Sequence, residues 1–321
     1  QERQLLIDLV TALRRSVALF LVLCFGAAAG VWAQPRALAL PAHERIKLDG
    51  RLDDPAWQTA PVQERFVQFL PVDRQPPPAG FRTTVQVLME ADALVIGVRA
   101  VDPAPERIRA PLVRRDQVKR DQDFIGIVID PVGDRRSAQF VRVNAAGVLA
   151  DGIYLAAGDV EDFAPDFGVD GAAVRLADGY SVEVRLPFIA LRYPRELNAP
   201  WRLMVTRSVP RESSVLLLSA PLTKDGLSFI AELEAIEGLD DLPQRLAQSG
   251  HWSVTPELTL RGTRERDGDS TAREEKASLG AELKWRPRAD WVLDATLNPD
   301  FAQVELDVPQ LAGNTRFALS V

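Results

Sequence analysis

Charged and amide side chains gather around two neighbouring segments near the middle of this 321-residue chain. An arginine fork binds vicinal hydroxyls or a carboxylate, and a nearby aspartate accepts hydrogen bonds from hydroxyls. Because an unpaired buried charge is very costly, such groups should lie at a rim or pair with each other. They are Asp121, Asp123 and Asp130 around residues 124–129, and Arg142, Asn144 and Asp151 on or after residues 140–143.

This pattern predicts a polar binding site without a catalytic residue or a cofactor. Two interpretations stay open: a rim that binds hydroxyls, and an Arg–Asp ion-pair network that only pins loops. Calcium between Asp121 and Asp123 is a further alternative, although no loop with calcium-binding spacing occurs. The candidate ligand-binding residues are Arg114, Arg115, Asp116, Asp123, Asn144, Asp151, Phe163, Asp166 and Phe167.

Composition excludes several kinds of site. The only histidines, His43 and His251, lie in different regions, so neither a Ser-His-Asp triad nor a histidine-rich zinc site is indicated. The only cysteine, Cys24, lies in a segment that we expect to be removed, which leaves no disulfide or thiolate ligand. The remaining chain has a net charge of about −8 with both signs interspersed, which argues against nucleic acid as a partner.

The start of the chain is typical of an export signal. Arg14 and Arg15 precede an uncharged run, residues 16–33, that ends in small residues before Gln34. We therefore expect residues 1–33 to be a secretory signal peptide that is cleaved after Ala33. A membrane-spanning anchor is the alternative for a run of this length.

The segments that position the polar set have the patterns of strands. Residues 124–129 are apolar on both faces, which predicts a strand in the middle of a sheet. In residues 180–186, Ser181, Glu183 and Arg185 alternate with apolar residues and predict a solvent-exposed face. Trp57 follows a helix start at Asp53 and is expected to be a core anchor. Strands are expected at residues 83–89, 93–101, 123–130, 139–144, 172–176, 179–186 and 201–208, which together predict an antiparallel β-sandwich over residues 34–240.

Five segments of this region occur in the order IKLDGRLDDPAW, VRAVDPAPERIRAPLVRRD, DFIGIVIDP, FVRVNAAGVLAD and YSVEVRLPFIALRY followed by Trp201. Together they resemble the family 9 carbohydrate-binding modules. The resemblance implies a β-sandwich that binds polysaccharide or oligosaccharide without catalysis, often attached to enzymes such as xylanases. Members that stack sugars carry tryptophans about where this chain has Pro165 and Val169, so Phe163 and Phe167 remain as weaker platforms or as core plugs.

After a connector at residues 241–250 the pattern changes. Residues 252–261, 277–285 and 291–297 alternate between apolar and polar side chains, with a long polar loop expected at 262–276 and a short turn at 286–290. Such strands are typical of a transmembrane β-barrel, whose apolar face contacts lipid. This topology places Trp252, Trp285 and Trp291 at one membrane interface. A soluble sandwich that continues the first domain is the alternative.

Residues 297–310, followed by NTRF, resemble the start of the barrel in an uncharacterised bacterial envelope family, where a sugar-module-like domain precedes an outer-membrane barrel. We therefore predict an all-β chain in which residues 251–321 are the N-terminal strands of an outer-membrane β-barrel. So few strands cannot close a barrel, so a longer protein is expected.

The functional prediction is non-catalytic carbohydrate binding in the periplasm, with polysaccharide or oligosaccharide and outer-membrane lipid as partners. The alternatives are a glycoside hydrolase, or an accessory module of one, and a structural plug or scaffold beneath the barrel.

Overall fold

The computed structural model describes residues 34–157, 160–194, 196–223, 228–248, 252–267, 270–288 and 291–298. Contacts divide the chain into two compact units, of which the first holds residues up to Leu191 and Leu197–Gln248 and the second holds the strands that follow. The expected signal peptide, residues 1–33, and residues 299–321 of the expected barrel lie outside the described residues. No helix among the described residues is both long enough and apolar enough to span a membrane.

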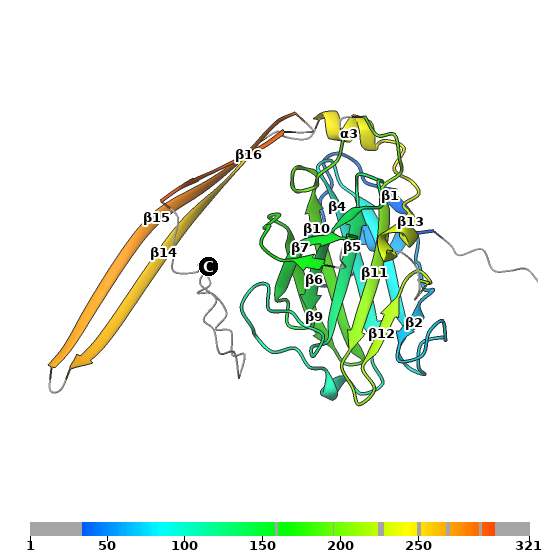
Figure 1. Ribbon diagram of the computed structural model, residues 1–321, viewed down its shortest axis with the longest axis horizontal. Helices are drawn as coiled ribbons and strands as arrows, with labels where there is room; N and C mark the ends of the chain where they lie inside the picture. The colour runs from blue at the N-terminus through cyan, green and yellow to red at the C-terminus, as the bar shows by residue number, and fades with distance from the viewer. Residues whose placement is uncertain are drawn as a thin grey trace, which may run out of the picture. The chain divides into compact units, whose positions relative to one another are not determined.

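The first unit is a β-sandwich of two sheets (Figure 1). The first sheet, in the order β1-β3-β4-β10-β9, consists of β1 (Ala37–Ala39), β3 (Thr83–Met89), β4 (Ala93–Val101), β10 (Gly179–Pro187) and β9 (Asp170–Leu176). The second sheet, in the order β2-β12-β11-β5-β6-β7-β8, consists of β2 (Val67–Leu70), β12 (Val215–Leu218), β11 (Arg202–Val209), β5 (Phe124–Asp130), β6 (Ser137–Asn144), β7 (Leu149–Leu155) and β8 (Val160–Asp162), with β13 (Glu234–Ala235) beside β11.

Neighbouring strands of the sandwich are antiparallel, except that β1 pairs parallel with β3. Helical segments are short: α2 (Pro55–Thr59), α3 (Leu242–Gln248), and the 3-10 turns η1 (Pro105–Arg107), η2 (Phe188–Ala190) and η3 (Phe229–Glu232). The predicted sandwich is thus confirmed.

Side chains from both sheets fill the interior. Ile125 and Ile127 of β5 and Val182 of β10 are at most 1% exposed. β5 lies between β11 and β6, as predicted for a strand that is apolar on both faces. Its other face is also covered, because Phe124 and Val128 are buried as well.

The outer face of the first sheet is covered, so the predicted solvent-exposed face of β10 was wrong. Glu183 is 0% exposed, and its Oε1 accepts a hydrogen bond from Trp57 Nε1 at 2.9 Å. Its Oε2 accepts from the main-chain N–H of Gly50 at 2.8 Å. Gly50 has a φ of 82°, and a Cβ there would lie 2.7 Å from the backbone of Ala173. The segment before and through α2 therefore packs on β10, and Trp57, 2% exposed, is the core anchor that the sequence predicted.

The second unit is an antiparallel sheet of β14 (Trp252–Asp267), β15 (Ser270–Arg288) and β16 (Trp291–Leu297). The predicted long loop at 262–276 was wrong, because β14 and β15 remain paired up to Asp267 and Ser270. Backbone pairing does not require apolar side chains, so the ladder continues past the end of the apolar alternation. In the sequence, Gly268 and Asp269 stand between the two strands.

Glu234 in β13 makes stability depend on pH. Burial raises the pKa of its carboxyl to about 7, and a hydrogen bond from Gln63 opposes this only in part. Glutamate in the unfolded chain ionises near pH 4.5. A group whose folded pKa is raised contributes stability that is present below the unfolded pKa and is lost as pH rises through the folded pKa.

We expect Glu234→Gln to remove this loss. The free energy of unfolding of the variant, relative to wild type, should rise by about 1 kcal/mol between pH 5 and pH 8, after allowance for solvent screening of a half-buried group. Urea unfolding of both proteins at the two pH values measures the difference. An identical difference at both values would contradict the assignment.

Candidate ligand-binding site

A cavity of about 430 Å³ lies on the outer face of the second sheet, which is turned away from the first sheet. Alternate residues of β5, β6 and β11 form its floor. Among the described residues, its aromatic lining consists of Phe69, Phe124, Phe140, Tyr154 and Phe229, and its polar lining of Arg120, Arg142, Glu161, Thr206, Thr223 and Ser228. Aromatic walls with a few polar groups are the usual composition of a small-molecule pocket.

A glycine, Gly126, lies in the floor of this cavity. Thr206, Gly126 and Arg142 stand in one row across β11, β5 and β6. A Cβ at Gly126 would lie 2.5 Å from Thr206 Oγ1, so any larger residue would collide with the hydroxyl. Because Gly126 has no side chain, the Thr206 hydroxyl can lie over β5 at the cavity floor.

Arg142 is held in a fixed place at the cavity. Its guanidinium carbon lies 5.3 Å from the ring centre of Phe124, 5.2 Å from that of Phe140 and 5.5 Å from that of Phe163. It also forms an ion pair with Glu161 of β8, and its side chain is 13% exposed. These contacts retain the charge beside an apolar surface. The sequence analysis placed Arg142 in the polar set but not among the candidate ligand-binding residues.

The predicted rim residues form a separate group, the rim network of Arg115, Asp116, Asp151 and Asp166. Arg115 donates to Asp151 Oδ1 at 2.6 Å and to Asp166 Oδ1 at 3.2 Å. The main-chain N–H of Asp151 donates to Asp116 Oδ1 at 3.1 Å. Burial raises the pKa of Asp151, although a hydrogen bond from the N–H of Phe167 and the charge of Arg115 oppose this. The network joins β7 to the loops that precede β5 and β9.

Other candidate ligand-binding residues lie away from the cavity, or their polar atoms are already hydrogen-bonded within the protein. Arg114 is exposed. Asn144 is 0% exposed, and its amide donates to Pro111 O and Gln122 Oε1 while its oxygen accepts from two main-chain N–H groups. Phe167 is 5% exposed, so its ring faces the interior. Phe163 packs edge-on against Phe140, with ring centres 5.1 Å apart, and is the predicted residue that adjoins the cavity.

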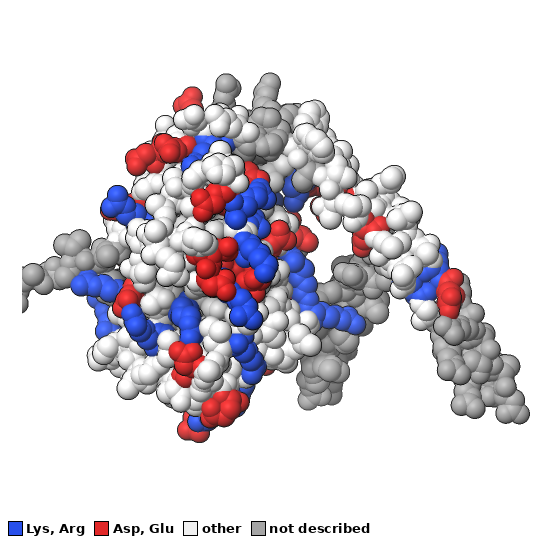
Figure 2. All heavy atoms as spheres, turned by 180° about the vertical axis from the view of Figure 1, so that it is seen from behind, with Lys and Arg blue, Asp and Glu red and all other residues white. Residues whose placement is uncertain are grey.

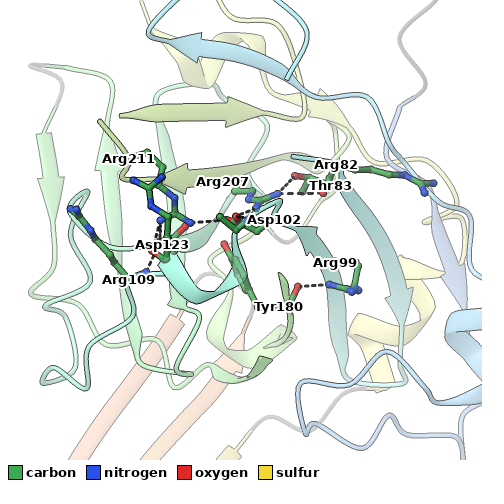
Figure 3. A network of polar contacts seen from close by, with 11 residues as sticks. Arg82, Thr83, Arg99, Asp102, Arg109, Asp123, Tyr180, Arg207 and Arg211 are labelled. Carbon is green, nitrogen blue, oxygen red and sulfur yellow. Dashed lines mark hydrogen bonds and ion pairs between the residues drawn. The ribbon is translucent and has the colours of Figure 1, made fainter. Parts of the chain in front are cut away.

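Asp123 belongs to a buried charge network between the sheets (Figure 3). Its Oδ2 accepts from Arg109 N at 2.7 Å and from Arg211 Nη1 at 3.2 Å, and burial raises its pKa. Arg211 Nη2 donates to Asp102 Oδ2 at 2.8 Å, which also lies 3.7 Å from Arg207. Asp123 Oδ1 is buried and has no hydrogen-bond partner among the described residues, and no cluster of metal-ligating side chains occurs in that part of the chain. Calcium at Asp121 and Asp123 stays an untested prediction.

Charges of both signs are interspersed on the face of the molecule shown in Figure 2. No single-sign field covers that face, as expected from the composition.

No protein-family model matches the chain, and no curated protein matches it. Its structural neighbours include a family 9 carbohydrate-binding module from Caldicellulosiruptor kristjanssonii in complex with cellotriose, with 14% identity, a TM-score of 0.46, and coverage of 65% of this chain and 96% of the module. A putative carbohydrate-binding protein from Bacteroides uniformis has 10% identity, a TM-score of 0.45, and coverage of 63% of this chain and 98% of its own. Agreement at this level is too loose to transfer a ligand or a binding residue.

We expect Arg115→Ala to lower the free energy of unfolding by about 2 kcal/mol, because it leaves the carboxylate of Asp151, which is 1% exposed, without its cation. The estimate is below that for a fully buried pair, since Arg115 is 38% exposed. Arg114→Ala is the matched control and should change stability by less than about 0.5 kcal/mol. Chemical denaturation measures both, and equal effects would contradict a rim network that holds the loops.

Proposed function

We propose that the sandwich binds an oligosaccharide, without catalysis, in the cavity on the outer face of its second sheet. The combination of aromatic walls with fixed polar groups in a volume of about 430 Å³ carries this proposal. Pockets of roughly 300 to 1,000 Å³ are the usual size for small ligands. Sugar C–H groups can pack on Phe229 and Tyr154, whose ring centres are 4.2 Å apart, while Thr206 and Glu161 accept hydrogen bonds from hydroxyls.

The ordered resemblance to family 9 modules supports this proposal. Two of the resembling segments supply the cavity: DFIGIVIDP provides Phe124 and Gly126, and FVRVNAAGVLAD provides Phe140 and Arg142. The chain lacks tryptophan at Pro165 and Val169, and Val169 is buried. Phenylalanine and tyrosine from the sheet and from η3 replace those tryptophans as the apolar surface for the sugar.

The composition of the cavity favours binding over hydrolysis. Glycoside hydrolases use two carboxyl groups that flank the scissile bond, about 5 to 9 Å apart. Glu161 is the single carboxylate in the described lining, and it is paired with Arg142. A structural plug, the third alternative, would not need an aromatic-lined cavity of this size.

We expect Thr206→Val to weaken oligosaccharide binding about tenfold, because it keeps the shape of the side chain and removes a hydroxyl from the floor. Phe229→Ala should weaken binding by a similar factor through loss of an aromatic face. The control is Thr84→Val, the same change at a half-buried position of the first sheet.

Calorimetry with cello-oligosaccharides, xylo-oligosaccharides and acidic oligosaccharides measures these effects. Equal losses in Thr206→Val and Thr84→Val, or no binding by the wild-type chain to any of these sugars, would reject the cavity as the site.

We further propose that β14, β15 and β16 begin an outer-membrane barrel, that the chain is exported, and that the sandwich lies in the periplasm. An apolar face of this sheet supports the proposal: Trp252 pairs with Trp285, and Leu258 with Leu279. Trp252 is 67% exposed, Leu258 62% and Leu279 73%. The opposite face pairs Thr259 with Ser278. Lipid as the solvent of the apolar face accounts for this two-faced pattern.

We expect Leu258→Asp to weaken binding of the chain to vesicles of phosphatidylethanolamine and phosphatidylglycerol about tenfold, because it places a charge on the lipid-facing side. Thr259→Asp, one residue on and on the other face, should change binding less than about twofold. Co-sedimentation and tryptophan emission report binding. Equal effects of the two substitutions would contradict lipid contact by this face.

A further inference from the structure

One positive charge of the cavity is not balanced by its described lining. Arg142 and Glu161 form an ion pair and neutralise each other. Arg120 also lines the cavity, and this residue is exposed. Within the described residues, its guanidinium has no ion-pair partner. A neutral ligand would leave this charge unused, whereas an anionic ligand would complement it.

Arg120 lies at the same end of the cavity as Arg142. Its main-chain oxygen accepts a hydrogen bond from Ser208 Oγ at 3.5 Å. Ser208 pairs with Phe124 across β11 and β5, one outer-face row away from the row of Thr206, Gly126 and Arg142. The main chain of Arg120 and the guanidinium of Arg142 therefore both lie near Phe124.

The other end of the cavity is mostly aromatic, and Ser228 beside Phe229 and Glu161 opposite Tyr154 are polar residues there. Met204, Val128 and Phe140 form the next outer-face row, and Tyr154 and Phe229 pack beyond it. The cavity thus has a basic end and an aromatic end. This arrangement fits a ligand with a negative group on one part and a sugar ring without charge on the other.

We propose that the ligand is an acidic oligosaccharide, one that contains a uronic acid, and that Arg120 binds its carboxylate. This inference rests on the proposed sugar-binding function and adds the chemical class of the sugar. The planar guanidinium fork matches a carboxylate with two parallel hydrogen bonds. Thr206 and the Arg142–Glu161 pair remain available for the hydroxyls of the same or the adjacent sugar.

The test compares trigalacturonate with its methyl ester, which keeps the sugar rings and removes the charges. Calorimetry of the full chain at low ionic strength should show binding about tenfold tighter for the acid. Arg120→Gln should reduce the affinity for the acid to that for the ester and leave the ester unchanged. Arg109→Gln, an exposed arginine of the same connection that does not line the cavity, should leave both affinities unchanged.

Two further measurements separate charge from fold. The preference for the acid should shrink when salt rises to about 0.15 M, because an exposed charge is screened. Arg120→Lys should retain part of the preference, since it keeps the charge and loses the fork. Circular dichroism confirms that each variant is folded.

Different results would overturn the acidic ligand and the sugar site. Equal binding of acid and ester, or equal weakening of both by Arg120→Gln, would overturn the acidic ligand and leave the sugar site standing. Failure of the folded wild-type chain to bind the acid, the ester or neutral oligosaccharides would overturn the sugar site, and the acidic ligand with it.

Discussion

The loops of the sandwich depend on the buried charge interactions of one residue, Arg207, whose side chain is wholly buried (Figure 3). From β11 in the second sheet it reaches Thr83 at the start of β3, at 3.0 Å, and Asp102 at the end of β4. Arg211 then links Asp102 to Asp123. Two arginines and two aspartates balance in charge, and loss of one partner would leave a buried ion unpaired at a cost of about 3 to 5 kcal/mol.

Asp102 and Asp123 are the two ends of the connection between β4 and β5, so the network closes that connection at its base. Further along, Pro111 is held by Asn144, and Asp116 is held by the main chain of Asp151. These anchors hold the connection that contains Arg120, which lines the cavity. Polar residues that the sequence suggested as ligand contacts form hydrogen bonds and ion pairs with the loops, while the outer face of the sheet carries the cavity proposed to bind the ligand.

Local patterns predicted much of the sandwich, since the bounds of β3 and β4 follow from short apolar runs between turn residues. These patterns gave wrong predictions where the burial of a side chain depends on residues that are distant in sequence. The alternating pattern of β10 predicts a solvent-exposed polar side, yet Glu183 on that side is covered by Trp57, which lies 126 residues away in sequence. The cavity was missed for the same reason: Arg142 is visible as a charge in an apolar strand, but the rings of Phe124 and Phe163 meet it only through strand register and the chain after β8.

The central claim is that the outer face of the second sheet, rather than the rim network, receives the sugar. Hydrogen–deuterium exchange of the full chain, with and without saturating trigalacturonate, tests it most directly. The account predicts slower exchange in peptides that contain Arg120, Glu161 and Phe229, with no change in peptides that contain Gly50 and Trp57 on the first sheet. Protection confined to the peptides of Arg115 and Asp166, with none at Phe229, would contradict it.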